Sequence, residues 1–402
     1  MSRSRFSRPV PSHRSSPDPL RRRRRRVAVA GFALALLVLA ACQPSPPPKT
    51  FTFSGGGWGH GVGMSQYGAL GMAKAGHNHV QILTTYYPGT EVVTRAPSDD
   101  LRVLVAERRP TLTFVTGGTT TFGAAGTVPA FKTVTMTRSG NSVRLGGALS
   151  ATVPALTITF SGDLRIGETG NAYRYGRVAV RPDPAGGLRA VVTNLTMNQY
   201  LYGIAEMPAS WHTQALRAQA VAARTFAQRR RDSRAGQGLD YDLLATVTDQ
   251  VYSGTRHEHE RWTSAVNVTN AQFLTYKGAL AETVYSSSNG GHSESSAYVW
   301  GGEVAYLRAR RDPYDQIPEN PNRAWTRTYT AAQLGAWFGV GTATSVTISG
   351  NVGASGRVDR ATITVTGTTG RRTMTGVAFR QWINAINPDR SDQLLSTKFV
   401  VK

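Results

Sequence analysis

The feature that most constrains this chain is a long Ala-rich helical pattern after a Glu-Met-Pro turn, within residues 198–231. Because Pro208 disfavours helix at the residue before it, the chain must turn at Met207. Ser210 is placed to cap the helix that follows. Apolar residues then recur at i, i+4, i+7 and i+11, which predicts one apolar helix face; they are Leu216, Ala220, Ala223 and Ala227. Most of them are small, so a neighbouring element can pack closely.

A lone carboxylate, Glu206, stands at the junction between this helix and a short helical pattern upstream, carried by Tyr200, Leu201 and Ile204. Two interpretations compete. In the first, Glu206 is an exposed turn residue beside the positive end of the following helix. In the second, it is a general acid in an apolar pocket whose desolvation raises its pKa; the candidate lining residues are Tyr202, Met207 and Trp211. Spacing alone does not choose between them.

The run GIAEMPASWHTQALRAQAVAARTFA, residues 203–227, resembles the core motif of the SpoIID/LytB family, which comprises stage II sporulation protein D and amidase enhancers. The chain departs from the usual motif at Gln214, Arg217 and Phe226, where Glu, Lys and Tyr are typical. The resemblance implies a lytic transglycosylase that acts on peptidoglycan glycan strands, with Glu206 as its acid/base. It also implies a preference for strands stripped of peptide. The alternative is a non-catalytic glycan-binding enhancer of a cell-wall amidase.

A glycine-rich block, GGGWGHGVGMSQYGA at residues 55–69, resembles a second signature of the same family. Its glycines permit close backbone approach or positive φ. No βαβ pattern surrounds the block and it lacks a Walker Lys, so it does not predict a nucleotide site. The resemblance implies that the block lines the sugar-binding groove through His60, Gly61, Ser65 and Gln66. For His60 alone, the alternative is a hydrogen-bonded structural histidine.

Residues 285–294, YSSSNGGHSE, resemble a third family signature. This turn is rich in hydroxyls and backbone donors that suit sugar hydroxyl and acetamido groups; the candidates are Ser286, Ser287, Ser288, Gly290 and Gly291. The other candidate substrate contacts are Trp211, Arg224, Asp249, Gln250 and Tyr252. Arg224, Asp249 and Asp312, the last in a D-P-Y-D loop, could instead be structural.

The alternating His and Glu of residues 257–260 raise the question of a metal site. Side chains at i and i+2 of a helix diverge, and no third ligand is specified, so a solvated polar turn is preferred. Some members of the family bind zinc near the third signature through His and Cys, but this chain offers no Cys there. We therefore expect no metal and no cofactor.

The order of the signatures is unusual, because in the family the glycine-rich block usually follows the Glu segment. Residues 396–402 resemble the family strand that normally precedes the block. Residues 51–53 resemble the strand that normally comes next after that strand. A circular permutation explains this order and requires the two ends to lie close together. It predicts that Phe51 and Val401 lie on the same or adjacent strands.

Residues 96–195 contain short alternating runs separated by turn signals, which predict antiparallel strands. The predicted fold class is α+β: an antiparallel β-rich scaffold with a helical catalytic segment, circularly permuted relative to the usual family order. The expected division is a signal peptide at 1–41, a lipidated Cys and Pro-rich linker at 42–50, a glycine-rich groove segment at 51–95 that packs with the core, a β-rich region at 96–195 and a catalytic core at 196–402.

The amino terminus predicts export. A basic block precedes an apolar run of about fifteen residues, which suits a signal peptide better than a membrane-spanning helix. The run ends in Leu39-Ala40-Ala41-Cys42, which resembles a bacterial lipobox and predicts lipidation of Cys42. The alternative is an ordinary cleaved signal with an incidental Cys. Cys42 is the only cysteine, so an internal disulfide is excluded.

Charge then narrows the class of partner. Residues 1–41 hold ten Arg and one Asp, so their removal lowers the net charge from +22 to +13. A basic exported protein suits an anionic cell-wall polymer or lipid surface, and nucleic acid is not an expected partner. The expected partners are peptidoglycan glycan strands, a cell-wall amidase and the membrane through the lipid, at the outer face of the cytoplasmic membrane or the cell wall.

Overall fold

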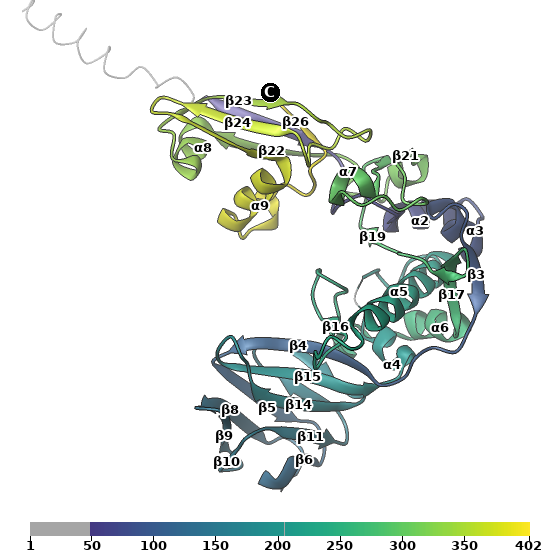
Figure 1. Ribbon diagram of the computed structural model, residues 1–402, viewed down its shortest axis with the longest axis vertical. Helices are drawn as coiled ribbons and strands as arrows, with labels where there is room; N and C mark the ends of the chain where they lie inside the picture. Colours follow the sequence, from purple (N-terminus) through teal and green to yellow (C-terminus); the bar gives the residue numbers. More distant parts are fainter. Residues whose placement is uncertain (1–48, 205) are drawn as a thin grey trace, which may run out of the picture. The chain divides into compact units, whose positions relative to one another are not determined.

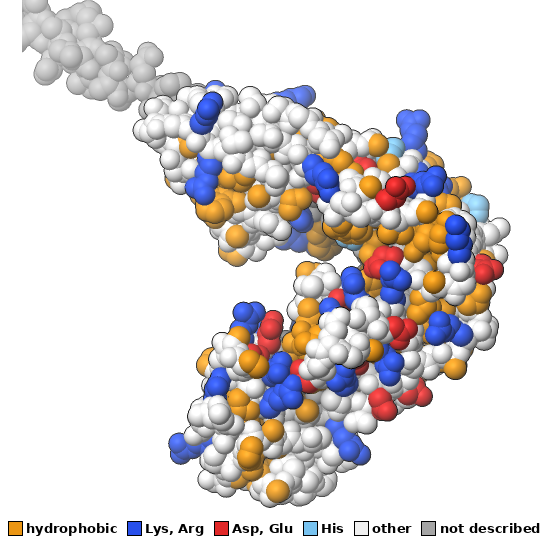
Figure 2. All heavy atoms as spheres, in the orientation of Figure 1, with side chains coloured by type: hydrophobic (Ala, Val, Ile, Leu, Met, Phe, Trp, Pro, Cys, Tyr) orange, Lys and Arg blue, Asp and Glu red, His pale blue; other side chains and the backbone are white. Residues whose placement is uncertain are grey.

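A computed structural model describes residues 49–204 and 206–402. Contacts separate Met1–Lys49 from a second unit, Thr50–Lys402, which contains all the elements below. The predicted signal peptide and Cys42 lie outside the described residues. Within those residues, no helix is both long and apolar enough to cross a membrane. On the face shown in Figure 2, Lys and Arg side chains are scattered over the surface and do not gather in one patch.

The predicted β-rich region forms two sheets that share one hydrophobic core (Figure 1). The alternating runs become strands because one face of each is buried, as in the Thr111–Thr116 strand. The six-stranded sheet has the order β10-β9-β8-β5-β12-β13, with bounds Ala151–Val153, Ser142–Gly147, Thr133–Ser139, Thr111–Thr116, Leu164–Ile166 and Asn171–Tyr173. The seven-stranded sheet has the order β16-β4-β15-β14-β11-β6-β7, with bounds Leu243–Leu244, Leu101–Arg109, Leu188–Leu195, Arg177–Pro182, Leu156–Phe160, Thr120–Phe122 and Thr127–Val128.

The predicted Ala-rich helix is α5, Thr213–Arg234. Its predicted apolar face is fully buried in the core that the two sheets share. A second face, which includes Val221, packs in another cluster with α2 (Gln66–Lys74), α3 (His79–Tyr86) and β17 (Gln272–Tyr276). Small side chains make this double burial possible, because two neighbours can approach one helix closely.

The start of α5 differs from the prediction. His212, and not Ser210, is its N-cap, and the His212 Nδ1 accepts a hydrogen bond from the Gln214 amide at 3.2 Å. The Pro208 turn extends over two more residues than the spacing suggested, so Ser210 lies in the turn before the helix. Two shorter helices flank the turn and α5: α4 (Met197–Tyr202) and α6 (Glu260–Val268).

The two ends of the described unit meet in one sheet with the order β22-β1-β26, formed by Trp325–Thr330, Thr50–Gly55 and Phe399–Val401. Phe53 is paired with Val401, and the Thr52 and Lys402 backbones exchange hydrogen bonds. The predicted adjacency of these strands is confirmed, while the permutation itself stays a prediction.

The remaining elements complete an α+β fold, which confirms the predicted class. A third core cluster joins the sheet β23-β24-β25 to two helices, which Figure 1 shows on one side of it; their bounds are β23 Ala343–Ser349, β24 Thr362–Gly367, β25 Arg371–Thr375, α8 Ala331–Phe338 and α9 Gly376–Ile386. The others are β2 Met64–Ser65, β3 Glu91–Thr94, β18 Ala279–Leu280, β19 Tyr285–Ser286, β20 His292–Ser293, β21 Arg310–Arg311, α7 Ser296–Trp300, η1 Gly123–Ala125, η2 Thr255–His257, η3 Pro313–Gln316 and η4 Arg390–Asp392.

Candidate functional site

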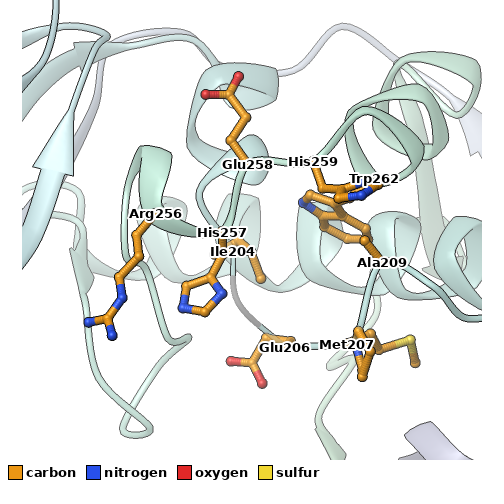
Figure 3. A pocket seen from close by; sticks show the side chains of 10 residues that line it. Ile204, Glu206, Met207, Ala209, Arg256, His257, Glu258, His259 and Trp262 are labelled. Atoms are coloured by element: carbon orange, nitrogen blue, oxygen red, sulfur yellow. The ribbon is translucent and has the colours of Figure 1, made fainter.

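Glu206 lies on a pocket of about 420 Å³ (Figure 3). The other lining residues are Ile204, Met207, Pro208, Ala209, Arg256, His257, Glu258, His259 and Trp262. Of the three side chains expected around Glu206, Met207 lines this pocket, but Tyr202 and Trp211 do not. The Tyr202 hydroxyl donates to Asn267 Oδ1 at 2.6 Å, and Trp211 packs on Tyr67 with ring centroids 4.7 Å apart. The indole in the lining is Trp262.

Two anchored segments hold Glu206 in place. Upstream, α4 begins with a capping box between Thr196 and Gln199, and the chain after the helix pairs Ile204 with Tyr252. The second segment is next to this pair: the Val251 amide, one residue before Tyr252, donates to Glu206 Oε1 at 2.8 Å. The carboxylate is therefore held by the residue beside Tyr252.

The electrostatics of Glu206 match the general-acid interpretation. The side chain is partly exposed at the pocket, yet the surrounding protein still removes water from the carboxylate. This burial raises the pKa of Glu206, although hydrogen bonds from the Val251 amide and the Gln66 side chain oppose the shift. A larger fraction of Glu206 is thus protonated near neutral pH than for an ordinary glutamate.

Gln66 brings the glycine-rich block to Glu206. It begins α2, is almost fully buried, and donates from Nε2 to Gln219 Oε1 of α5 at 3.3 Å. Gln219 Nε2 has no hydrogen-bond partner among the described residues. The contact between α2 and α5 therefore joins two of the sequence signatures at the carboxylate.

A buried polar network lies behind the carboxylate. The Tyr200 hydroxyl donates to Gln250 Oε1 at 2.9 Å, and Gln250 Nε2 donates to the Tyr285 hydroxyl at 2.9 Å and to the Ala223 carbonyl at 3.3 Å. Burial raises the pKa of both tyrosines, and the charge of Glu206 adds to both shifts. Gln250 is thus a fully buried support of the site.

One wall of the pocket is the loop of residues 254–259, which the β-rich region holds. The Tyr175 hydroxyl donates to Glu258 Oε1 at 2.7 Å, and the Thr255 hydroxyl donates to the Ala172 carbonyl at 3.2 Å. Gly254 has a φ of 59°, and a Cβ there would lie 2.0 Å from the Ala172 carbonyl oxygen. The loop therefore depends on a glycine, on the Ala172 carbonyl of β13 and on the Tyr175 hydroxyl that follows this strand.

This loop was expected to be a solvated polar turn. His257 and His259 are indeed exposed, but both line the pocket with Glu206, and His259 also caps α6 by accepting from the Arg261 amide at 3.2 Å. Figure 3 draws the Glu258 carboxylate directed away from Glu206, in agreement with its bond to Tyr175. The polar run is thus part of the site wall.

The other two signatures meet around a different carboxylate, Asp315 of the D-P-Y-D loop. It is fully buried and accepts hydrogen bonds from the Ser65 hydroxyl at 2.5 Å, the Ser288 hydroxyl at 2.9 Å and the Gly291 amide at 3.0 Å. Ser65 also caps α2. The structure thus places Ser65, Ser288 and Gly291 in an internal network, with their polar atoms bonded to protein.

The glycines of the block allow close approach between protein segments. Gly57 has a φ of 82°, and a Cβ there would lie 2.9 Å from the Ser288 carbonyl oxygen, while a Cβ on Gly290 would lie 2.7 Å from the Gly56 carbonyl carbon. The Gly61 amide donates to Ser286 Oγ at 3.2 Å. The Ser287 carbonyl accepts from the Tyr67 amide at 3.1 Å.

The remaining candidate contacts divide between the interior and a second pocket. Arg224 is fully buried in α5 and donates to the Val266 carbonyl at 3.0 Å. Asp249 pairs with Arg234 at 2.6 Å, and Tyr252 stacks on Tyr200 with ring centroids 5.2 Å apart. These three positions are structural supports. His60 lies in a second pocket, of about 330 Å³, with its ring 5.0 Å from that of Trp300.

The sequence analysis missed Tyr285, Gln219 and the pocket wall. Gln219 and Tyr285 sit inside quoted motifs, but only the folded structure shows that Gln219 contacts Gln66 and that Tyr285 contacts Gln250. The wall comes from contacts between positions far apart in the chain, such as Tyr175 and Glu258. Among the described residues, no group of three or more His, Cys, Asp or Glu side chains is arranged to hold a metal ion.

Comparison with known proteins shows which family this segment of the chain matches. A family model described as "SpoIID: Stage II sporulation protein" matches residues 186–276, the segment that carries Glu206, α5 and the pocket wall. Residues 186–276 thus carry a segment of the SpoIID/LytB family. Within this family, the amidase enhancer of Bacillus subtilis (strain 168) is 39% identical over 129 residues, which cover 32% of this chain and 16% of the relative.

Two further relatives are stage II sporulation proteins D. The protein of Bacillus subtilis (strain 168) is 30% identical over 164 residues, and that of Bacillus amyloliquefaciens is 28% identical over 164 residues. In both cases the match covers 37% of this chain and 47% of the relative. The chain therefore spans less than half of the length of each of these SpoIID/LytB relatives, in a family related to the cell wall and sporulation.

Proposed function

We propose that this protein is a lytic transglycosylase that cleaves peptidoglycan glycan strands between N-acetylmuramic acid and N-acetylglucosamine. The observation that carries the proposal is the state of Glu206: a carboxylic acid with a raised pKa, held by the Val251 amide on the edge of a pocket of about 420 Å³. A group that must first give and then take a proton needs a pKa near the working pH.

In the proposed reaction, protonated Glu206 donates its proton to the glycosidic oxygen as the bond from that oxygen to the anomeric carbon of the muramic residue breaks. The 6-hydroxyl oxygen of the same residue then bonds to this carbon, and its proton passes to the Glu206 carboxylate. The products are a 1,6-anhydromuramic end and a free 4-hydroxyl on the glucosamine. One acid/base group is enough, because no water molecule is consumed.

The surrounding residues fit this cycle. The Val251 amide and Gln66 hydrogen-bond to the Glu206 carboxylate, so they stabilise it in the charged form it takes after the first step. Gln250 hydrogen-bonds to both Tyr200 and Tyr285, which lie behind the Glu206 carboxylate. Trp262 adds an apolar surface to the lining, which suits the face of a sugar ring.

The proposal is tested by incubating the protein with intact and with amidase-stripped glycan strands and identifying the products by mass spectrometry. We expect 1,6-anhydromuramic ends from the wild type and none from Glu206→Gln. Glu260→Gln is the matched control, because Glu260 is exposed in the first turn of α6, next to the pocket wall. Unchanged release of anhydro products by Glu206→Gln would refute the assignment.

A second candidate function is favoured by a specific relative, the one named amidase enhancer. In this alternative the pocket binds wall glycan and the protein stimulates a cell-wall amidase without cleaving the strand. Binding of both substrates without cleavage of either, together with faster peptide release by an added amidase, would support it. The Glu206→Gln variant separates the two functions, since an enhancer does not need that proton.

We also propose that the protein is exported and anchored by a lipid on Cys42 to the outer face of the cytoplasmic membrane. The basic block, the apolar run and the lipobox-like end at Ala41-Cys42 support this. Labelling of expressing cells with a radioactive fatty acid should mark the wild type and not Cys42→Ser. Equal labelling of both would contradict the proposal.

A further inference from the structure

The contact between α2 and α5 contains two glutamine side chains that meet inside the protein. α2 packs on the face of α5 that carries Ala215, Ala218 and Ala222. Gln219 lies on the same face, one turn from Ala215 and Ala222, and its side chain is fully buried. Because the neighbouring side chains are small, α2 comes close enough for Gln66 Nε2 to donate to Gln219 Oε1 at 3.3 Å.

The orientation of both amides follows from the carboxylate of Glu206. Gln66 also hydrogen-bonds to this carboxylate, which can only accept, so Gln66 must turn its NH2 group toward it. The two hydrogens of that NH2 group then serve two acceptors, one on Glu206 and one on Gln219. Gln219 must present its carbonyl oxygen, since its own NH2 group would face another donor.

This orientation leaves Gln219 Nε2 buried and without a hydrogen-bond partner in the described part of the chain. An unpaired buried donor lowers stability, so packing alone does not favour a glutamine at this position. Gln228, also buried on α5, shows the contrast. Its Nε2 donates to Ser98 Oγ at 2.7 Å and to Asp232 Oδ1 at 2.8 Å, and its Oε1 accepts from the Ser98 amide at 2.9 Å. Gln219 uses only its acceptor, and uses it toward Gln66.

We propose that Gln219 is a positioning residue of the site: its carbonyl oxygen holds the Gln66 amide so that a hydrogen of Gln66 Nε2 points at the Glu206 carboxylate. Without this acceptor, the Gln66 side chain can rotate out of alignment. The consequence for catalysis rests on the proposed function, in which the bond from Gln66 stabilises the carboxylate that remains after proton donation. The effect on the proton equilibrium of Glu206 does not depend on that function.

Other groups also face Glu206, and the test leaves them unchanged. The Val251 amide donates to the carboxylate, and Tyr200 and Tyr285 lie behind it. The titratable residues that line the pocket with Glu206 are Arg256, His257, Glu258 and His259. Gln219 is uncharged and acts through Gln66, so its effect on Glu206 should disappear when Gln66 is also replaced.

The test is an NMR titration of the full chain labelled with carbon-13 at the glutamate carboxyls, with Glu206→Gln used to assign the Glu206 signal. We expect Gln219→Met to lower the acid dissociation constant of Glu206 roughly tenfold, as for the loss of a hydrogen bond to a charged group. Gln66→Met should do the same, and the double variant should shift no further than either one. The urea midpoint of Gln219→Met should stay the same or rise, because an unpaired donor is removed.

Gln228→Met is the matched control on the same helix. Because it breaks three hydrogen bonds, it should lower the urea midpoint and leave the Glu206 titration unchanged. If Gln219→Met misfolds, Gln219→Leu removes the same acceptor and replaces it in the titration.

An unchanged Glu206 titration in the Gln219 variant would overturn the proposal and assign Gln219 a structural role only. A double variant whose shift equals the sum of the two single shifts would also overturn it, since Gln219 would then act independently of Gln66. The expected shifts in a protein that cleaves no glycan at any pH would uphold the role of Gln219 and reject only the proposed cleavage.

Discussion

Two carboxylates of this protein, Glu206 and Asp315, both lie at sequence signatures of one family, yet they have opposite surroundings. Asp315 is fully buried, and its oxygens accept several hydrogen bonds from hydroxyls and amides. Glu206 is partly exposed on a pocket and has a raised pKa. The comparison teaches that a polar motif can serve either to hold segments together or to do chemistry. The partial exposure of Glu206 on its pocket is what suits it to the chemistry proposed above.

The largest expected effect is on activity, from Glu206→Gln. The amide cannot donate and recover a proton, so we expect glycan cleavage to fall by roughly 10²–10⁴-fold, the usual contribution of a general acid/base. The melting temperature should change little, because Gln is isosteric and Glu206 is partly exposed. Product release measured by mass spectrometry, with circular dichroism for the fold, checks both parts. A variant that keeps activity would remove the contrast with Asp315.

The second effect is on stability, from Asp315→Ala. The substitution leaves buried donors from Ser65, Ser288 and Gly291 without an acceptor. We expect a loss of about 3–5 kcal/mol of unfolding free energy, as for the removal of one partner from a buried charged network. Urea unfolding measures it, and Glu319→Ala on the exposed surface is the control. A loss below about 1 kcal/mol would contradict the structural role of Asp315.

The pH dependence of cleavage sharpens the contrast further. Since burial raises the pKa of Glu206 above the ordinary 4.5, the protonated form is favoured in the folded state. The contribution of protonated Glu206 to the stability of the folded state is fully present below pH 4.5. It is lost as the pH rises through the raised pKa. The rate of cleavage, which needs protonated Glu206, should therefore fall as the pH rises through the same raised pKa.

This decline is measured as the rate of cleavage against pH for wild type and for Val251→Pro, which removes the amide donor to Glu206. Loss of that bond should move the alkaline limit to higher pH, because the bond stabilises the carboxylate. Folding of the variant is checked by its circular dichroism spectrum. An alkaline limit at the pKa of an ordinary glutamate, or one that moves to lower pH in the variant, would contradict the assigned environment.

The smallest expected effect comes from Tyr175→Phe, which removes the hydroxyl that holds Glu258 in the pocket wall. We expect the unfolding free energy to fall by about 1.5–3 kcal/mol at most, because the lost hydrogen bond is to a charged group. We also expect a several-fold lower rate of cleavage. Thr121→Val, in the same β-rich region but away from the pocket, is the control. An unchanged rate would mean that the β-rich region does not support the site.

The sequence allowed much of the segment around Glu206 to be predicted, because the constraints are local. Pro208 requires a turn, and the Ala face of α5 requires a close neighbour, and both features are present. The antiparallel strands of the β-rich region followed from alternation in the same way. The N-cap of α5 is His212 and not the predicted Ser210, because the turn after Pro208 is longer than the residue types of this segment indicate.

The pocket wall and the second pocket could not be predicted, because they depend on contacts between distant segments. Nothing local to Glu258 points to Tyr175, and nothing local to His60 points to Trp300. The serines of the third signature could equally have faced a sugar or the interior. In this structure Ser288 faces the interior, because its hydroxyl donates to Asp315 of the folded D-P-Y-D loop.

The most direct test of the central claim, that Glu206 cleaves glycan without water, is digestion of stripped strands in water enriched in oxygen-18, followed by mass spectrometry of the new ends. Attack of the muramic 6-hydroxyl on the anomeric carbon of the same residue predicts anhydro ends that contain no oxygen-18. The Glu206→Gln variant should produce no anhydro ends. Reducing ends that carry the heavy isotope would show hydrolysis instead and would contradict the account.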